Sequence, residues 1–324
     1  MESPSRIEEA IAALRRGEAI GLPTETVYGL AADARDAAAV RRIFELKGRP
    51  ADHPLIVHLA ESGWLERWAR DVPTEAVVLA DRFWPGPMTL ILQRQPDVLD
   101  AVTGGQDTVG LRVPAHPLAR DVIARFGDGL AAPSANRYGR VSPTTAQHVR
   151  DEFGDSVPIV LDGGDCEVGI ESTIVDLSCD APRILRPGRI TRAELEAAIG
   201  PVESGATAAS PRTAGTHAAH YAPRTPIELA PSAELAGRIA AHRHAGRRVA
   251  TLARAAVPEG AEGIAAGAAA RDYAHALYAA LRALDALGAE RIVIETPPDG
   301  AEWTAIRDRL MRAAAGAPLD GPGT

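Results

Sequence analysis

Two residue types that each occur once in this chain are the first candidates for chemistry. The sequence has 34 arginines but a single lysine, Lys47, and a single asparagine, Asn136. Drift toward GC-rich codons replaces lysine with arginine wherever any cation serves, yet a compact ammonium and a planar guanidinium are not interchangeable. The persistence of Lys47 therefore indicates a role that arginine cannot perform, with chance persistence as the alternative.

A second cation and two histidines follow Lys47 closely. Arg49 lies just beyond Gly48, after the end of a predicted helix. Two cations at this place can bind an anionic ligand, or they can merely cap the last carbonyl groups of the helix. His53 and His58 are predicted to lie near the edge of the next strand. Because no third metal ligand accompanies them, a hydrogen-bonding role is the better interpretation of both.

A lone arginine lies within the apolar segment 108–114, which is typical of a strand. Side chains alternate along a strand, so Thr108, Gly110 and Arg112 share one face. A guanidinium in such surroundings needs an anion, either an internal carboxylate or the carboxylate or phosphate of a ligand. The residues alone leave both alternatives open.

Several other predicted strands end in, or contain, one polar residue that could bind a ligand. Segment 22–30 (LPTETVYGL) offers hydroxyl groups that can bind a ligand or satisfy a turn. The chain contains no Ser-His-Asp, HExxH or GxSxG signature, so we expect a site that binds anions more than one that attacks with a side chain. The other such segments are 131–136 (AAPSAN), 170–175 (IESTIV) and 184–188 (ILRPG).

These residues must be positioned by alternating helices and strands, which predict an α/β fold with a mixed sheet. Ser5 and Glu8 are expected to form a capping box at the start of the first helix. Helical periodicity predicts helices near 5–16, 37–46, 74–83, 117–126, 143–153 and 191–199. Apolar runs predict strands near 19–23, 55–59, 88–92, 108–113, 129–132, 157–161, 172–177 and 183–186.

The length of 324 residues favours two domains. We predict a first domain at 1–200 and a linker at 201–226, which is rich in Ala, Ser, Thr, Pro and Gly. A smaller α/β domain is predicted at 227–324, with strands at the PIELA, RRVATLA and RIVIET segments and helices near 232–244, 269–287 and 303–314. It contains neither a GxGxxG motif nor a Walker lysine.

Composition disfavours several classes of protein. The net charge of −8 lies entirely within residues 1–200, which hold 22 basic and 30 acidic side chains. This balance disfavours binding to nucleic acid through phosphates alone, although it allows a local basic patch. Cys166 and Cys179 are predicted to be reduced thiols. The sequence shows neither a signal peptide nor an apolar run that could span a membrane, so we expect a cytoplasmic protein.

Seven motifs of this chain, taken in order, resemble one known family. They are PTETVYGL, KGRPxxHPLxVH, FWPGPMTL, TVGLRVPxHP, APSAN, GIESTIVD and ILRPG. The chain is similar to the YrdC-type threonylcarbamoyl-AMP synthases, and His220-Tyr221-Ala222-Pro223 resembles the linker of their long, two-domain form. The resemblance implies a YrdC-like catalytic domain with a twisted mixed sheet and flanking helices, followed by a smaller Rossmann-like α/β domain.

The resemblance also implies an activity. It implies a nucleotidyltransferase that converts L-threonine, bicarbonate and ATP to threonylcarbamoyl-AMP and pyrophosphate, with Mg²⁺ bound to the nucleotide. The product would pass to the tRNA threonylcarbamoyl transferase machinery, which modifies tRNA next to the anticodon, and a weak contact with RNA is compatible with this role. Catalysis is expected to come from positioning and charge neutralisation, without a covalent enzyme intermediate.

The family's functional residues carry over by position. Lys47 and Arg49 are the expected catalytic cations. His217 departs from the residues common at that point of the linker. Because a carbamate and a mixed anhydride decompose in water, the linker with Tyr221 is expected to form a lid that excludes solvent. The implied ATP site comprises Lys47, Arg49, His53, Thr108, Ser134, Asn136, Arg186 and Tyr221. The implied threonine site comprises Thr26, His58, Arg112, Ala132 and Ser172.

Two other classes of function fit less well. A protein that binds structured RNA through such a domain would need a basic surface, which the charge of residues 1–200 disfavours. A carbamoyltransferase of hydrogenase maturation would carry zinc-finger-like cysteine pairs and an acylphosphatase-like segment. Neither feature occurs in this sequence.

Overall fold

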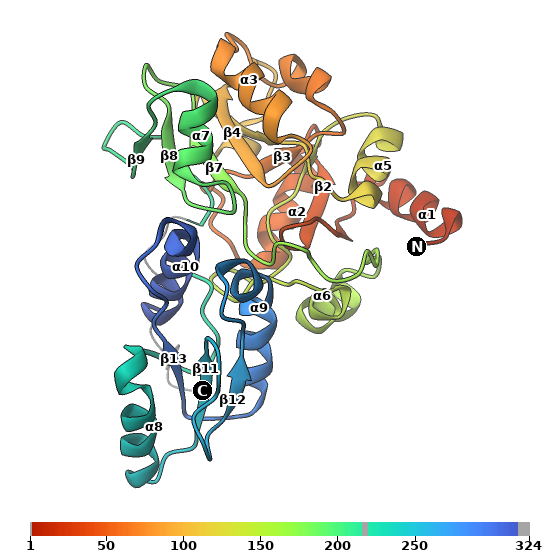
Figure 1. Ribbon diagram of the computed structural model, residues 1–324. Coiled ribbons are helices and arrows are strands. Elements are labelled where there is room, and N and C mark those ends of the chain that lie inside the picture. The colour runs from red at the N-terminus through yellow and green to blue at the C-terminus, as the bar shows by residue number, and fades with distance from the viewer. Residues whose placement is uncertain (1, 216–219, 317–324) are drawn as a thin grey trace. The chain divides into compact units, whose positions relative to one another are not determined.

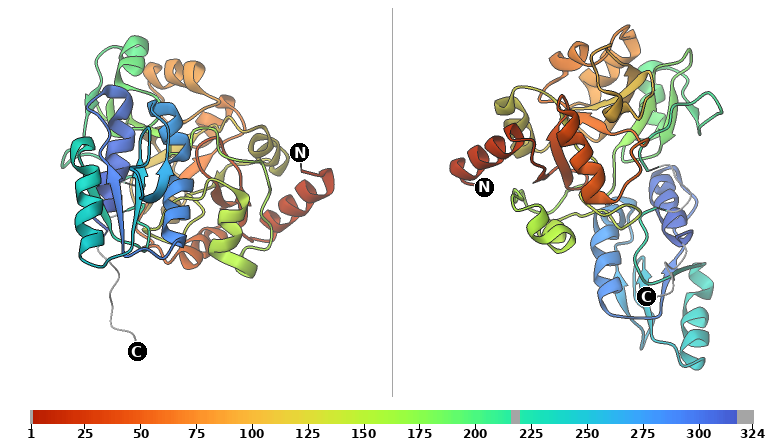
Figure 2. Two further views of the ribbon diagram at one scale, coloured as in Figure 1. Left: turned by 60° about the horizontal axis from the view of Figure 1, so that its bottom comes forward. Right: turned by 180° about the vertical axis from the view of Figure 1, so that it is seen from behind.

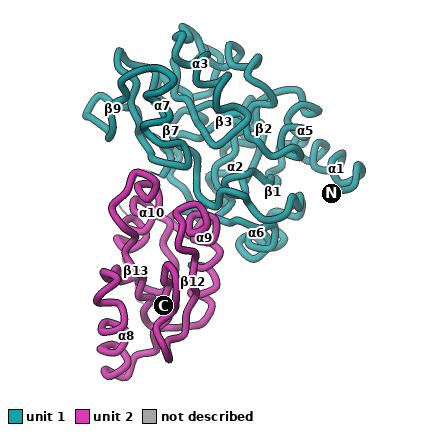
Figure 3. Tube along the Cα trace, viewed as in Figure 1, with its two compact units in different colours: residues 1–138, 143–216 teal, residues 139–142, 217–324 magenta. Residues whose placement is uncertain are grey.

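The computed structural model describes residues 2–215 and 220–316, and the chain folds into two compact units (Figures 1 and 3). The first unit comprises residues 1–138 and 143–216, and the second comprises residues 139–142 and 217–324. The predicted linker, 201–226, is thus shared between the two units. Within the described ranges no helix is long and apolar enough to cross a membrane.

The first unit is built on a large sheet, which has nine strands within the described ranges. The pairs β3–β5, β4–β7 and β8–β9 are parallel, and the other pairs are antiparallel. The prediction of a mixed sheet is therefore confirmed. In spatial order the strands are β1 (Ile20–Leu22), β2 (Gly29–Asp33), β6 (Leu130–Ala131), β3 (Ile56–His58), β5 (Thr108–Arg112), β4 (Met88–Gln93), β7 (Thr173–Asp176), β8 (Arg183–Arg186) and β9 (Glu203–Ser204).

Local capping signals fix where the helices of this unit begin and end. In α2, the Asp36 side chain accepts a hydrogen bond from Ala38 N at 2.8 Å, and Gly48 ends the helix with a φ of 60°. Lys47 is thereby held in the last turn, directly before a residue that can adopt the left-handed conformation. The helices are α1 (Pro4–Arg15), α2 (Ala37–Lys47), α3 (Thr74–Phe83), α4 (Asp100–Thr103), α5 (Pro117–Phe126), α6 (Ala146–Phe153) and α7 (Arg192–Ile199).

The two faces of the large sheet differ in character. Cα partners place Ile56 beside Gly110 and Gly110 beside Ile91, so these residues share a face. The other face belongs to the main hydrophobic core, where apolar residues of the helices pack against Val57, Leu90, Leu92, Val109, Leu111 and Val175. The first face carries a small apolar cluster of Ile91, Ile174 and Leu185, with the half-buried Ile56 against it. This open face also carries Thr108 and Arg112, as alternation predicts.

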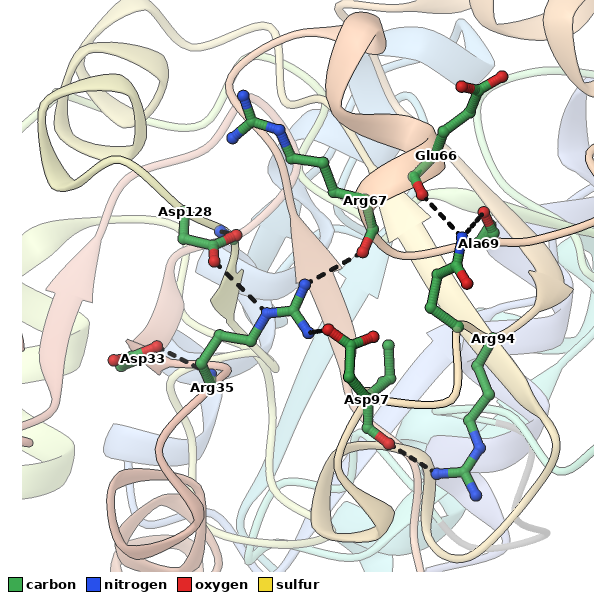
Figure 4. Close-up of polar contacts among 11 residues, drawn as sticks. Asp33, Arg35, Glu66, Arg67, Ala69, Arg94, Asp97 and Asp128 are labelled. Atoms are coloured by element: carbon green, nitrogen blue, oxygen red, sulfur yellow. Dashed lines mark hydrogen bonds and ion pairs between the residues drawn. The ribbon is translucent and has the colours of Figure 1, made fainter.

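A cation at the start of the β2–α2 connection joins loops that are far apart in sequence (Figure 4). The Arg35 guanidinium donates to Asp97 at 2.9 Å, to the carbonyl oxygen of Arg67 at 3.1 Å and to Asp128 at 3.4 Å. It also lies 3.9 Å from the ring centroid of the fully buried Trp68. These contacts connect the loop before β6 to the segment after β3, and so support the middle of the sheet.

The structure corrects two local predictions. The first helix is capped by Ser3, whose Oγ accepts from Arg6 N at 3.3 Å, and Ser5 lies within the helix. The expected capping box of Ser5 and Glu8 is therefore wrong, because Pro4 takes the first helical position. Segment 157–161 forms no strand among the described residues and contributes a single bridge, from Val160 to Gly21.

Three strands of the described residues were not predicted, and one of them, the short β9, lies within the predicted linker. β2 (Gly29–Asp33, GLAAD) consists of small residues, and β12 (Glu262–Ala265, EGIA) has one β-branched residue. Neither is rich in the β-branched and aromatic residues that indicate strands. In each case pairing with a neighbouring strand determines the conformation.

The second unit has a parallel sheet with helices on both sides (Figure 2). Its strands, in spatial order, are β10 (Ile227–Ala230), β13 (Arg291–Glu295), β11 (Val249–Ala253) and β12. Helix α8 (Leu235–His244) contacts β11 and β13, α9 (Ala270–Ala286) contacts β11 and β12, and α10 (Thr304–Ala314) contacts β10. All strand pairs of this sheet are parallel, which is typical of Rossmann-like folds.

Gly188, just after β8, provides a test of how tightly the open face is packed. A Cβ added there would lie 2.7 Å from the carbonyl carbon of Ser172, which is backbone and cannot move alone. We expect Gly188→Ala to lower the free energy of unfolding by about 1–3 kcal/mol. Gly63→Ala is the matched control, since its Cβ would lie 3.7 Å from the nearest heavy atom, and it should change stability by less than about 0.5 kcal/mol. Urea unfolding measures both, and equal stabilities would contradict this account.

Candidate active site

The open face of the large sheet brings together most of the residues implied for threonine. His58 and Arg112 are Cα partners across β3 and β5. Ser172 lies immediately before β7, and Thr26 lies in the turn between β1 and β2. All four side chains are buried. Residues from four separate segments therefore converge on one part of this face.

The Arg112 guanidinium makes three polar contacts with the described residues of the protein. Its Nε donates to the carbonyl oxygen of Gly86 at 3.2 Å, and its Nη1 donates to Thr26 Oγ1 at 2.9 Å. Its Nη2 lies 2.8 Å from Oε1 of Glu25. Of the two alternatives left open by the sequence, an internal carboxylate is thus present. Arg112 can bind a ligand carboxylate as well, because a guanidinium carries five N–H donors.

Ser172 and Arg186 form a second connected group. Arg186 Nη2 donates to Ser172 Oγ at 3.0 Å, and its Nε donates to the carbonyl oxygen of Ser172 at 3.1 Å. Ser172 Oγ lies 2.8 Å from Oγ1 of Thr89 in β4. A residue implied for ATP thus touches a residue implied for threonine.

The single lysine and the single asparagine of the chain contact each other. Lys47 Nζ donates to the carbonyl oxygens of both Ser134 and Asn136. Asn136 Nδ2 donates to the carbonyl oxygen of Arg137 at 2.7 Å. Burial, followed by the nearby charge of Arg49, lowers the pKa of Lys47 well below its usual value. A compact ammonium fits between two carbonyl oxygens where a planar guanidinium would not, which accounts for the retention of lysine.

Of the remaining residues implied for ATP in this unit, Arg49 and His53 follow Lys47 closely in the chain, and Thr108 lies on β5. Arg49 is half-buried and donates through Nη2 to the carbonyl oxygen of Pro54 at 2.9 Å. The His53 ring lies 5.4 Å from the ring of Tyr138, whose backbone N donates to the carbonyl oxygen of Lys47. Thr108 is half-buried at the start of β5.

One strand connects the two groups. Ala132, implied for threonine, follows β6, and its backbone N donates to the carbonyl oxygen of Ile56 at 3.0 Å. Within β6, Leu130 is the Cα partner of His58. Ser134 and Asn136 lie only a few residues further along the chain, so the Lys47 group and the Arg112 group are adjacent on the sheet.

His58 is electrically neutral in this setting. Burial, followed by the charge of Arg112, lowers its pKa from 6.5 to about 3, against a smaller opposite effect of the Ile56 carbonyl. Its Nδ1 lies 3.4 Å from that carbonyl oxygen. With the proton assigned to Nδ1, Nε2 is an acceptor and suits a hydroxyl donor. A hydrogen-bonding role therefore fits the geometry.

The end of the segment 201–215 lies against the open face. A small pocket on this face is lined by Ile56, Ile91, Gly110 and Ile174, and by Arg212, Thr213 and Ala214 on its other side. The Ala214 carbonyl oxygen accepts from Arg186 Nη1 at 3.0 Å. Arg212 N donates to Gln106 Oε1 at 2.6 Å. Part of the predicted linker thus covers implied site residues.

Tyr221 belongs to the second unit. It is buried, has a φ of 61°, and its ring stacks on Tyr278 at 5.7 Å between centroids. The Arg309 guanidinium lies 5.2 Å from the same ring. Its implied contact with ATP stays a prediction. His217 lies outside the described residues.

Sequence reasoning missed two polar residues of this face, Glu25 and Thr89. Glu25 lies between two threonines in the quoted motif, and Thr89 interrupts the apolar run MTLILQ. A buried carboxylate beside an arginine and a hydroxyl inside an apolar strand are the signals that could have identified them.

Family models match nearly the whole chain. The model described as "Telomere recombination", for Sua5, YciO and YrdC proteins, matches residues 12–188. The chain belongs to the Sua5/YciO/YrdC family. A second model, described as "Threonylcarbamoyl-AMP synthase, C-terminal domain", matches residues 190–315. The chain is therefore of the long, two-domain Sua5 type.

Relatives of known name have the same extent. The threonylcarbamoyl-AMP synthase of Bacillus subtilis is 41% identical over 323 residues, which cover 96% of this chain and 93% of that protein. The synthase of Pyrococcus abyssi is 38% identical and covers 95% of each chain. A crystal structure of P. abyssi Sua5 complexed with L-threonine matches with a TM-score of 0.92 and 37% identity, over 98% of this chain and 96% of the other.

The depressed pKa of His58 predicts a dependence of stability on pH. Below pH 6.5 the unfolded chain binds a proton at this residue, while the folded protein does not. The free energy of unfolding therefore decreases as the pH is lowered from 6.5 to about 3. Between pH 8 and pH 5 the wild type should lose roughly 1–2 kcal/mol more than His58→Gln. Urea unfolding at both pH values measures this difference. Equal losses, or an imidazole NMR signal of His58 that titrates near its ordinary pKa, would contradict the assignment.

Proposed function

We propose that this chain makes threonylcarbamoyl-AMP from L-threonine, bicarbonate and ATP, for a tRNA modification. The observation that carries the proposal is its similarity, along nearly its whole length, to threonylcarbamoyl-AMP synthases at 38% and 41% identity. The family neighbour solved with L-threonine supports threonine as a substrate. The chain is accordingly an enzyme that forms an adenylate. Because the adenylyl group moves from ATP to a carbamate, its reaction class is nucleotidyl transfer.

The threonine site is proposed at the Arg112 group. A guanidinium binds a carboxylate bidentately, and Arg112 is already oriented by Gly86 and Thr26. Neutral His58 and the hydroxyl of Ser172 can bind the substrate hydroxyl by hydrogen bonds. The backbone of Ala132 lies on the neighbouring strand, and its close approach would limit the size of the amino-acid side chain.

The ATP site is proposed at the Lys47 group and Arg186. Two of the three N–H donors of Lys47 are used by backbone carbonyl oxygens, which leaves one for a phosphate oxygen. Arg49, His53, Thr108, Ser134, Asn136 and Tyr221 complete the proposed contacts. Within the described residues no group of three or more His, Cys, Asp or Glu could hold a metal ion. We propose that Mg²⁺ comes with the nucleotide, bound to its phosphates, where it would neutralise their charge.

The reaction needs positioning more than a nucleophilic side chain. The threonine ammonium first loses a proton to solvent, and the free amine then bonds to the carbon of bicarbonate with loss of water, which gives a carbamate. A carbamate oxygen then attacks the α-phosphorus of ATP, and pyrophosphate leaves. Lys47 and Arg49 stabilise the negative charge that moves toward the leaving group. The adjacency of the two groups on the sheet supports this order of events, because both reactants must be held at once.

The later fate of the product is also proposed. We expect the adenylate to pass to the tRNA threonylcarbamoyl transferase machinery in the cytoplasm, with at most a weak direct contact to RNA. The segment that ends at Ala214 is proposed to act, with the Tyr221 part of the linker, as a lid that protects the carbamate from water.

Pyrophosphate release that requires both L-threonine and bicarbonate tests the function. Lys47→Ala should lower its rate about ten- to hundredfold, as expected for the loss of a charge-assisted hydrogen bond of roughly 1.5–3 kcal/mol. Lys47→Arg should not restore the full rate, because the guanidinium does not fit between the two carbonyl oxygens. Arg41→Ala, which removes an exposed cation from the same helix, is the control. Wild-type turnover by Lys47→Ala, with an unchanged unfolding temperature, would refute the role of this lysine.

Limited trypsin digestion tests the lid. Cleavage after Arg212, an exposed residue that covers the open face, should slow about tenfold or more when ATP and threonine are both saturating. Cleavage between the exposed Arg247 and Arg248 of the second unit should not change and serves as the control. If ligands leave the rate at Arg212 unaltered, this segment does not close over a substrate.

A further inference from the structure

Glu25 is a buried carboxylate for which the proposed roles give no use. It lies in the turn between β1 and β2, is 5% exposed, and belongs to the same turn as Thr26. The turn is rigid, because Thr24 Oγ1 donates to the carbonyl oxygen of Val27 at 2.6 Å and the Glu25 carbonyl oxygen accepts from Val168 N at 2.8 Å. The backbone that carries this carboxylate is thus held in place.

The pairing of Glu25 with Arg112 is incomplete. Oε1 lies 2.8 Å from Nη2 of Arg112, close enough for an ion pair. Among the described residues, however, neither Glu25 oxygen accepts a hydrogen bond, and Nη2 donates none. Two buried opposite charges therefore lie side by side with unused donors and acceptors.

Unused capacity of this kind is costly in a protein interior. A buried ion pair offsets the cost of desolvation only when its remaining donors and acceptors are also satisfied. Buried polar groups without partners are rare in native proteins, and each one calls for an explanation such as a bound ligand. The pair is therefore better suited to a bound state in which both charges gain partners.

An α-amino acid has the complementary charges. Its carboxylate and its ammonium are attached to the same carbon, so they lie about as far apart as the charges of a contacting ion pair. Arg112 can donate to the carboxylate, and the neighbouring anion is then in reach of the ammonium. We propose that Glu25 binds the α-ammonium group of the amino-acid substrate. The inference rests on the proposed function and adds the anion that recognises this group.

The neighbours of Glu25 support this assignment. Cys166 is buried near it, and burial raises the pKa of this thiol, so Cys166 stays neutral and supplies no charge. His58 is neutral as well. Glu25 is thus the acidic side chain that pairs with Arg112 among the described residues. A substrate with a hydroxyl or a hydrogen in place of the ammonium would leave this carboxylate unpaired.

Calorimetric titration of the full-length protein with two probes tests the inference. The probes are L-threonine and 2,3-dihydroxybutanoate of matching configuration, in which a hydroxyl replaces the ammonium. The wild type should bind threonine more tightly by about ten- to hundredfold, as charge-assisted hydrogen bonds imply. Glu25→Gln should weaken threonine by that factor, leave the hydroxy acid within about threefold, and so remove most of the discrimination. Glu25→Asp, which keeps the charge, should retain part of it.

A matched control comes from a second buried carboxylate, which pairs with a half-buried arginine in the second unit. Glu295 is 6% exposed and lies 3.6 Å from Nε of Arg254. Glu295→Gln removes a similar charge elsewhere and should leave threonine binding unchanged. Thermal unfolding of both variants separates loss of folding from loss of binding.

The outcomes are distinct. If Glu25→Gln weakens both probes equally, Glu25 only orients Arg112 and the inference is overturned. It is also overturned if the variant binds threonine as the wild type does. If the wild type neither binds threonine nor releases pyrophosphate in its presence, the proposed function itself fails. Loss of discrimination in Glu25→Gln, with wild-type behaviour of Glu295→Gln, supports the inference.

Discussion

The neutralisation of one buried guanidinium organises the open face of the large sheet. Arg112 lies at the end of β5, and its partners come from a turn before β4 and from the turn between β1 and β2. A buried cation that loses a partner is strongly destabilising, so these distant segments are tied to one geometry. The consequence is a rigid arrangement of the hydroxyl of Thr26 and the carboxylate of Glu25 before any ligand binds.

Lys47 is also a buried cation, but its hydrogen-bond partners are of a different kind. Its ammonium donates to backbone carbonyl oxygens of a loop, and within the described part of the chain no carboxylate is hydrogen-bonded to it. The loop is thereby pulled toward the end of α2, next to a strand that hydrogen-bonds to β3. The loop that binds Lys47 thus continues directly from β6, and β6 pairs with β3, which lies beside β5, the strand that carries Arg112.

The sequence predicted the elements better than it predicted their partners. Helices α3 and α5 were predicted at their observed ends because apolar periodicity agrees with local signals such as Pro117 and Gly127. β2 was missed because GLAAD has no strand propensity and forms by pairing with β1 and β6. Ser5 and Glu8 have the spacing of a capping box, but Ser3 caps the helix because Pro4 takes the first helical position.

At the site, too, local sequence patterns predicted the positions of residues but not which residues contact each other. Alternation placed Thr108, Gly110 and Arg112 on one face correctly, since it depends only on the strand itself. That Arg112 meets Glu25, or that Lys47 meets Asn136, depends on the order of strands in the sheet, which no local pattern encodes. The rarity of Lys47 and Asn136 pointed to both residues but not to their contact.

The Lys47 group and the Arg112 group also differ in how many hydrogen-bond donors and acceptors they leave without a protein partner. Lys47 is mostly satisfied by the protein, whereas Arg112 and Glu25 keep donors and acceptors that the described residues do not fill. A group that is satisfied in advance shapes a loop, whereas a group with unused donors or acceptors can bind a ligand with them. For a reaction whose carbamate decomposes in water, this division is advantageous. The amino acid completes an existing charge arrangement, so it is held in place next to the nucleotide site before the unstable intermediate forms.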